Sequence, residues 1–146
     1  MSNTRIEIVN AVSASMKAIS TGSGSYTDFN DVKVWRVTAY NDNDFPAINI
    51  RDISDIQSVW TLPKRIKHSL TIEIEVAVSG NGTLNALREM ISDVESAIGK
   101  DETFGGLALK TIPKKNELVS HQDKAKIGGA LITIVVEYVT GRWKEN

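Results

Sequence analysis

The sequence predicts an α+β fold in which two amphipathic helices pack on a mixed, mostly antiparallel β-sheet. Two separate segments repeat apolar residues at helical spacing, and residues 70–78 alternate between apolar and polar or small side chains. Helices and strands follow one another without an internal repeat or linker. With 146 residues, 41% of them hydrophobic and 24% charged, the chain has the size and composition of one globular domain. We therefore expect a single domain over residues 1–146.

Residues 4–20 are predicted to form the first helix. Thr4 and Glu7 have the spacing of a capping box, in which each side chain bonds the backbone of the other. An apolar face follows at intervals of three and four, formed by Ile8, Val12, Met16 and Ile19 together with Val9. Glycine and serine in residues 21–25 end this pattern, and a loop is expected to reach Asp31.

The middle of the chain is predicted to supply the first strands of the sheet. Residues 32–40 are rich in β-branched and aromatic types, and the turn-forming residues 41–44 follow them. A further strand is expected over residues 45–51, with Pro46 at its start because proline cannot donate a ladder hydrogen bond. The alternation in residues 70–78 is typical of an antiparallel sheet with one solvated face.

After a turn at residues 80–82, Thr83 is predicted to cap a second helix that ends near Gly99. Its apolar face should pack on the sheet, and its charged face should meet solvent. A strand over 107–112, a polar loop over 113–126 and a strong strand over 130–139 complete the prediction. The expected apolar face is Leu84, Leu87, Ile91, Val94 and Ile98, and the expected solvent face includes Arg88, Glu89, Asp93 and Glu95.

Composition argues against several classes of function. A net charge of −1 disfavours a domain whose main partner is nucleic acid. The chain has no cysteine, which excludes disulfides, thiolate metal ligands and cysteine nucleophiles. The start of the chain lacks a secretion-signal pattern, and no apolar run approaches the roughly 20 residues needed to span a bilayer, so no membrane partner is expected.

Little in the sequence indicates catalysis. His68 and His121 lie in unrelated segments and do not form a zinc motif, and His68 falls in the inward phase of a strand, where packing is expected. Glu73 and Glu75 share one strand face, as paired catalytic carboxylates could, but charged residues are common on a solvated face. The glycine pairs lack a complete phosphate-binding pattern. We predict no catalytic, cofactor or metal site.

Two regions of opposite charge are candidates for protein contacts. Residues 42–55 contain four aspartates and one arginine, a balance of −3, whereas residues 110–126 contain five lysines and two acids, a balance of +3. We hypothesise that these regions meet between neighbouring copies, because complementary charges steer and register protein contacts; a solvated basic loop is the alternative. The residues are Asp42, Asp44, Asp52 and Asp55 on one side, and Lys110, Lys114, Lys115, Lys124 and Lys126 on the other.

The three tryptophans are predicted to play different roles. Trp35 lies in an expected strand and is assigned to the core. Trp60 and Trp143 lie in an expected loop and in the C-terminal tail, where a partner could bury them. Tryptophan is enriched at interface hot spots, so both are candidate contact residues.

The order of these segments resembles that of bacteriophage tail terminator proteins. The resemblance covers most of the chain and is most characteristic where a helix is followed by Phe-Gly-Gly-Leu-Ala-Leu. It implies a small, non-catalytic α/β subunit that forms a ring, commonly a hexamer, at the head-proximal end of a tail tube. The matching segments are Phe45-Pro-Ala-Ile48, Arg65-x-x-His-Ser-Leu-Thr-Ile-Glu-Ile-Glu-Val76, Leu84–Ile98, Gly105-Gly-Leu-Ala-Leu109 and Gly129-Ala-Leu-Ile-Thr-Ile-Val-Val-Glu-Tyr138.

The resemblance also implies a set of partners. These are further copies of the chain in the ring, the tail tube protein, a head–tail connector or neck protein, and a tail sheath protein if the tail contracts. DNA would only pass through the ring lumen, and the chain would reside in the virion tail after assembly in the host cytoplasm. Loops 20–31, 41–65 and 110–127 are the expected contact segments. The alternatives are another neck, head-closure or tail-completion protein, or a small ligand-binding or enzymatic α/β domain.

Overall fold

A computed structural model describes residues 3–60, 64–79, 84–120 and 128–144. Its elements confirm the predicted α+β class. The α-helices are α1 (Thr4–Lys17) and α2 (Leu84–Gly99), with short 3₁₀ turns η1 (Thr21–Ser23) and η2 (Asp42–Asp44). The strands are β1 (Asp31–Val34), β2 (Ala47–Val59), β3 (Arg65–Val78), β4 (Lys110–Ser120) and β5 (Gly128–Gly141).

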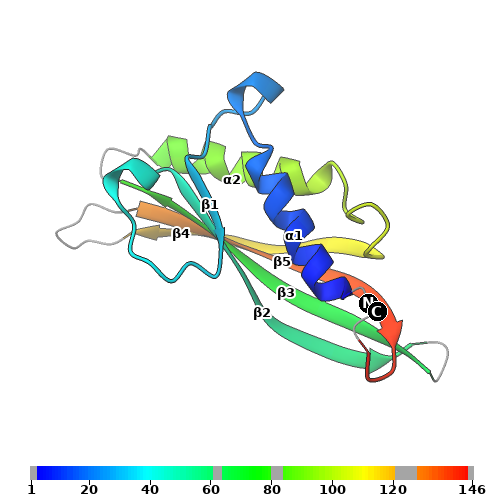
Figure 1. The fold of residues 1–146 in the computed structure, drawn as a ribbon. Coiled ribbons are helices and arrows are strands. Elements are labelled where there is room, and N and C mark those ends of the chain that lie inside the picture. The colour runs from blue at the N-terminus through cyan, green and yellow to red at the C-terminus, as the bar shows by residue number, and fades with distance from the viewer. Residues whose placement is uncertain (1–2, 61–63, 80–83, 121–127, 145–146) are drawn as a thin grey trace.

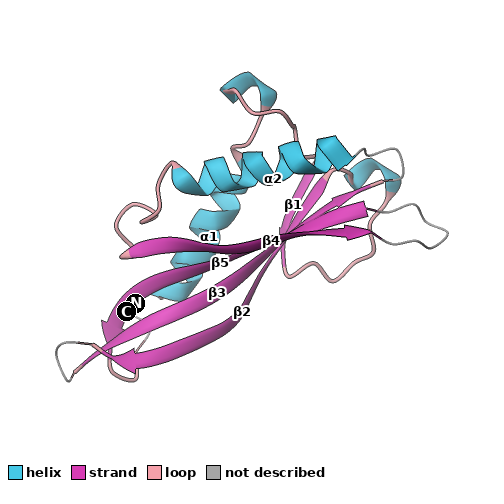
Figure 2. Ribbon diagram, turned by 180° about the vertical axis from the view of Figure 1, so that it is seen from behind, coloured by secondary structure: helices cyan, strands magenta, loops and turns pink. Residues whose placement is uncertain are grey.

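The strands form one sheet in the order β1-β2-β3-β5-β4. β1 runs parallel to β2, and the other neighbouring pairs are antiparallel, so the predicted mixed and mostly antiparallel sheet is confirmed. Both helices lie on the same face of this sheet (Figures 1 and 2). The opposite face carries no helix in the part of the chain that the structure describes.

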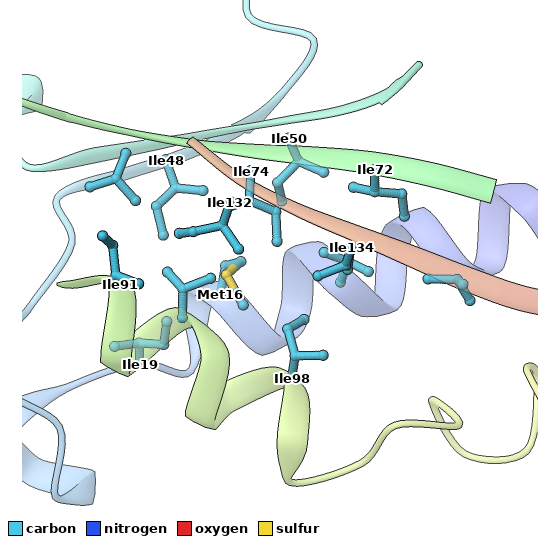
Figure 3. Packing of buried hydrophobic residues seen from close by; sticks show 14 of the residues in the cluster. Met16, Ile19, Ile48, Ile50, Ile72, Ile74, Ile91, Ile98, Ile132 and Ile134 are labelled. Carbon is cyan, nitrogen blue, oxygen red and sulfur yellow. The ribbon is translucent and has the colours of Figure 1, made fainter. Parts of the chain in front are cut away.

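The core lies between the two helices and the even-numbered residues of β3 and β5. Ile74 of β3 and Ile132 of β5 are buried and lie close to Met16 of α1, and the buried Ile72 points from β3 toward the helix side of the sheet (Figure 3). Fully burying a side chain of this size contributes about 1.5–3 kcal/mol before conformational entropy is subtracted. The alternation that predicted the strand is therefore also the pattern that builds the core.

The helices begin and pack slightly differently from the prediction. The carboxamide of Asn3, rather than Thr4, caps α1 by accepting the backbone N–H of Ile6 at 3.0 Å. On α2, Leu84 is exposed and Asp93 is buried, so both assignments were wrong. Asp93 is buried because the chain leaving α1 covers it, and its Oδ1 accepts the backbone N–H of Tyr26 at 3.0 Å. The predicted cap Thr83 and the turn at 80–82 lie outside the described residues.

Three segments differ from the predicted strands and loops. The strand expected over 32–40 ends at Val34, because Trp35 adopts a left-handed backbone with φ of 48° and turns the chain away. Trp35 is also half exposed, so its assignment to the core was wrong. Residues expected as loops form the second half of β2 and most of β4. Both strands contain a register shift, between Asp52 and Ser54 and between Pro113 and Lys115, which interrupts the alternation that would have revealed them.

Gly129 of β5 lies too close to the backbone of β3 to carry a side chain. A Cβ atom at this position would lie 2.7 Å from the carbonyl oxygen of Val76, whereas one at Gly128 would meet only side chains at 3.6 Å or more. We expect Gly129→Ala to lower the free energy of unfolding by about 1–3 kcal/mol, because the backbone must move apart. Gly128→Ala is the matched control and should have a smaller effect. Urea unfolding of both variants tests this, and equal effects would contradict it.

Candidate interaction surface

Strands β2, β3 and β5 extend beyond the N-terminal end of α1. Figure 1 shows this extension at the lower right and Figure 2 at the lower left. We define the sheet arm as residues 54–60, 65–69 and 138–144. Its position follows from strand length, since β3 and β5 pair along their whole lengths from Arg65–Gly141 to Val78–Gly128.

The sheet arm exposes large apolar side chains. Trp143 is 91% exposed, Ile56 70% and Val59 68%. Trp143 also has a left-handed backbone with φ of 61°, a conformation that costs a residue with a side chain about 1–2 kcal/mol. Trp143 therefore keeps a large aromatic side chain in water on a strained backbone, which makes it a candidate for contact with a partner.

A shallow hollow of about 280 Å³ lies beside Trp143. Its walls include Gln57 of β2 and Ile66 of β3, and Lys144 adds a positive charge. The hollow is open and mixes apolar and polar groups, which suits a side chain of a protein partner better than a small molecule that must be enclosed.

A buried hydrogen-bond network supports the sheet arm from inside. His68 Nδ1 lies 2.6 Å from Asp55 Oδ2, and His68 Nε2 lies 2.7 Å from the hydroxyl of Thr140. The hydroxyl of Thr140 also donates to the carbonyl of Gly141 at 3.0 Å, which extends the network to the end of β5. The ring also stacks on Tyr138, with centroids 4.3 Å apart. The predicted packing role of His68 is confirmed, and its hydrogen bond with Asp55 joins β2 to β3.

The order Thr140, His68, Asp55 resembles the nucleophile, base and acid of a hydrolase triad. The nucleophile position is unsuitable, however, because Thr140 is fully buried and its hydroxyl is bonded to Gly141. A substrate carbonyl could not approach it without opening the sheet arm. The geometry is therefore that of a structural network.

Glu73 and Glu75 share the helix-free face of the sheet with Arg51. The guanidinium lies 3.5 Å from Glu73 and 3.8 Å from Glu75, so the two carboxylates have a counter-ion. The hydroxyl of Tyr40 donates to Glu75 at 3.3 Å. Burial and the negative charge of Glu75 raise the pKa of Tyr40 to about 12, which makes it a poor proton donor or acceptor near neutral pH. The solvent-facing carboxylates of Glu73 and Glu75 therefore form ion pairs with Arg51.

Most of the predicted acidic region has partners within the chain. Asp44 lies 2.8 Å from Arg36, and Asp52 lies 2.8 Å from Arg5. The carboxylate of Asp55 is buried against His68. Asp42 is exposed, so its carboxylate meets solvent. The pairing of this region with a neighbouring copy stays a prediction that now depends on fewer free charges.

The predicted basic region lies on β4, at the other edge of the sheet. Lys110, Lys114 and Lys115 are all exposed there, with Lys110 3.8 Å from Glu137 and Lys115 3.5 Å from Glu117. Lys124 and Lys126, like His121, lie outside the described residues. β3 and β5 separate this edge from Asp52 and Asp55 on β2.

The remaining predicted contact residue, Trp60, is half-buried at the end of β2. Its backbone N–H donates to the carbonyl of Arg65 at 3.0 Å, which closes the hairpin, and Lys67 lies 5.8 Å from the indole centroid. Sequence reasoning missed Ile56 and Val59, although apolar residues spaced by three in a polar segment were visible there.

The described residues do not contain a cluster of His, Cys, Asp or Glu suited to a metal ion. Among the same residues, no helix is long and apolar enough to cross a membrane. The site features found in the described part of the chain are therefore those of a surface rather than of a metal centre.

The sequence matches no protein-family profile and no curated protein. Among solved structures, the chain is similar to one chain in the virion of a native gene transfer agent (GTA) particle, with 6% sequence identity and a TM-score of 0.44. The alignment covers 94% of this chain and 92% of that chain. A TM-score below 0.5 does not establish a common fold, so the proposals below rest on the chain's own features.

The contact between Arg5, Trp35 and Asp52 should make stability depend on acidic pH. Burial alone would raise the pKa of Asp52, but hydrogen bonds from the Trp35 indole and the Arg5 guanidinium hold it below its ordinary value of 3.8. The stabilisation is therefore present above pH 3.8 and is lost as the pH falls through the lower folded-state pKa. Asp52→Asn should flatten this loss of unfolding free energy below pH 3.8, whereas exposed Asp42→Asn should not. Urea titrations across that range test it, and identical profiles would contradict it.

Proposed function

We propose that this chain is a virion structural protein that ends a phage tail tube. In this role, copies form a ring, hexameric in the implied arrangement, at the head-proximal end of the tube. One face of the ring stops addition of tube protein, and the other accepts the head connector. The resemblance of segment order to tail terminator proteins supplies this specific assignment.

Trp143 is the observation that carries an assembly role. An exposed indole in a left-handed backbone destabilises the free chain, and burial by a partner would offset that cost. Ile56 and Val59 add exposed apolar side chains on the two opposite faces of the sheet arm. Large exposed apolar groups of this kind are characteristic of protein contacts.

The placement of charge supports a head-to-tail contact between copies. Lysines line the β4 edge, whereas the exposed Asp42 lies in η2, which precedes β2 at the other side of the sheet. A contact that joins two different surfaces of a subunit closes into a ring when its rotation closes. Asp52 and Asp55 already contact Arg5 and His68 of their own chain, so the lysine edge would meet other acidic groups, of which Asp42 is an exposed example.

The two alternatives are separated by different observations. Another neck or tail-completion protein would use the same kind of surface and differs only in where it binds. A small enzyme needs accessible reactive groups, and the two candidate clusters, around His68 and around Glu75, are a buried network and an ion-paired surface. The assembly role is therefore the better supported class.

Inactivating the gene for this chain in a phage that encodes it tests the terminator role directly. We expect tail tubes longer than normal and heads without tails, because nothing would stop tube growth. Electron microscopy of the lysate gives the tube-length distribution. Tubes of normal length without heads would favour the neck-protein alternative, and normal complete particles would exclude both.

Trp143→Gly separates assembly from folding. Glycine accepts the left-handed backbone without strain, so the free chain should be at least as stable as the natural one. Loss of the indole should nevertheless lower the yield of complete particles when the variant gene replaces the natural one. Val37→Ala changes a residue that is 95% exposed and off the sheet arm, and should leave both quantities unchanged. A Trp143→Gly variant that assembles normally would remove the main support for this surface.

A further inference from the structure

The second half of β2 is an open edge of the sheet. β1 pairs with β2 only at residues 47–50, and the Trp35 N–H then bonds the Ile50 carbonyl at 2.8 Å. Within the described residues, no strand pairs with residues 53–59 on that side. Figure 2 shows β2 as the outermost strand along this stretch. An unpaired edge is a template for another strand.

This edge differs from the edge formed by β4. Edge strands are commonly protected by lysine, proline or a bulge, and β4 has Pro113, exposed Lys114 and Lys115, and a register shift between Pro113 and Lys115. Residues 54–59 of β2 contain no lysine, arginine or proline. Their acidic side chain, Asp55, is buried. The register shift of β2 lies between Asp52 and Ser54, at the start of this stretch, so residues 54–59 themselves carry no lysine, proline or bulge and are available for pairing.

We propose that the occupant of this edge is the same edge of a second copy, paired antiparallel about a twofold axis at Ile56. Residues 54–58 of the two copies then lie opposite one another. Ile56 meets Ile56 of the second copy, Ser54 meets Ser58, and Asp55 meets Gln57. Ile53 and Val59 lie at the two ends of the pairing, where each extends the apolar contact.

The alternation of side chains restricts the register. A twofold axis perpendicular to the sheet keeps each face on its own side, so residues of one face must lie opposite residues of that face. The axis must therefore pass through a residue. An axis at Asp55 would place the two aspartates directly opposite, which is destabilising. An axis at Gln57 would place Asp55 opposite Val59, whereas the axis at Ile56 gives matched pairs throughout.

Asp55 supplies an independent reason for this register. Its Oδ2 accepts hydrogen bonds from His68 and from Gln57 of its own chain, but its Oδ1 is buried without a hydrogen-bond partner. An unsatisfied buried acceptor costs about 1–3 kcal/mol. In the proposed register, Gln57 of the second copy lies opposite Asp55 on the same face, so its carboxamide is the nearest new donor.

This pairing goes beyond the proposed function and does not depend on it. A cyclic ring in which all copies face the same way is built from head-to-tail contacts, whereas a twofold contact is symmetric. The edge-paired dimer is therefore the state of the chain before it joins a ring. Its two copies would separate from each other before a ring closes. Failure of one proposal leaves the other standing.

Single cysteines test the register, because the natural chain contains none. Residues opposite each other in an antiparallel pair have Cα atoms about 4.5–5.5 Å apart, within the range that a disulfide spans. Ile56→Cys should form a disulfide-linked dimer on mild oxidation. Ser54→Cys should link to Ser58→Cys in a mixture but not to itself, since the two copies of residue 54 would lie about 13 Å apart. Non-reducing electrophoresis reads the result.

Charged substitutions at the axis test the contact without cross-linking. Ile56→Lys and Ile56→Asp each place like charges opposite one another and should run as monomers, whereas an equal mixture of the two should regain the dimer. Sedimentation velocity should show the natural chain at twice its 16.0 kDa mass. Val37→Lys, at an exposed site away from the edge, should keep that mass.

Any of three results with the free chain and its variants, or a fourth seen with a hexamer, would overturn the pairing. The three are a natural chain that stays monomeric at every concentration, self-linking of Ser54→Cys with none of Ile56→Cys, and a failure of the lysine and aspartate variants to associate when mixed. A closed hexamer of the free chain that does not link through Ile56→Cys would also reject the pairing, while it would support the ring.

Discussion

The antiparallel ladder between β3 and β5 is the constraint on which the rest of the structure depends. Its side chains alternate with a period of two, so one register decides which residues meet the helices and which meet solvent. Ile72 and Ile134 lie inward in that register, whereas Glu73 and Thr133 lie on the other face. Gly129 permits the strands to approach at one end. A slip of one residue would bury the charges and expose the core.

The same ladder explains why the molecule has an apolar surface away from its core. β3 and β5 are longer than the helices that cover them, and the extra length forms the sheet arm (Figure 1). In place of a helix, the pair of His68 with Asp55 and the hydroxyl of Thr140 connect its strands. Polar bonds can hold strands in register without covering their outer side chains. Val59 and Trp143 therefore remain in water.

The sequence predicted the parts of the fold that obey a single periodicity. α2 and the alternating strand β3 appeared close to their predicted positions because their patterns are uninterrupted. The second half of β2 and most of β4 were missed, because a register shift in each changes the phase of the pattern. The charged residues proposed as contact sites show a second limit of prediction from sequence. Composition identified Asp52 as acidic, but only the fold brings Arg5 and Trp35 to it across the chain.

The unequal edges of the sheet have a consequence for how far self-association can proceed. A sheet with two receptive edges can add copies at both ends and grow into a fibril. In the described part of this chain the β4 edge bears proline and lysine and the β1 edge is only four residues long, which leaves residues 54–59 of β2 as the receptive edge. Once two β2 edges meet, the strands left at the borders of the joined sheet are β4 and the four-residue β1, a short strand that bears the exposed Lys33. Strand addition therefore stops at the dimer. The chain can keep one receptive edge without forming a continuous fibril.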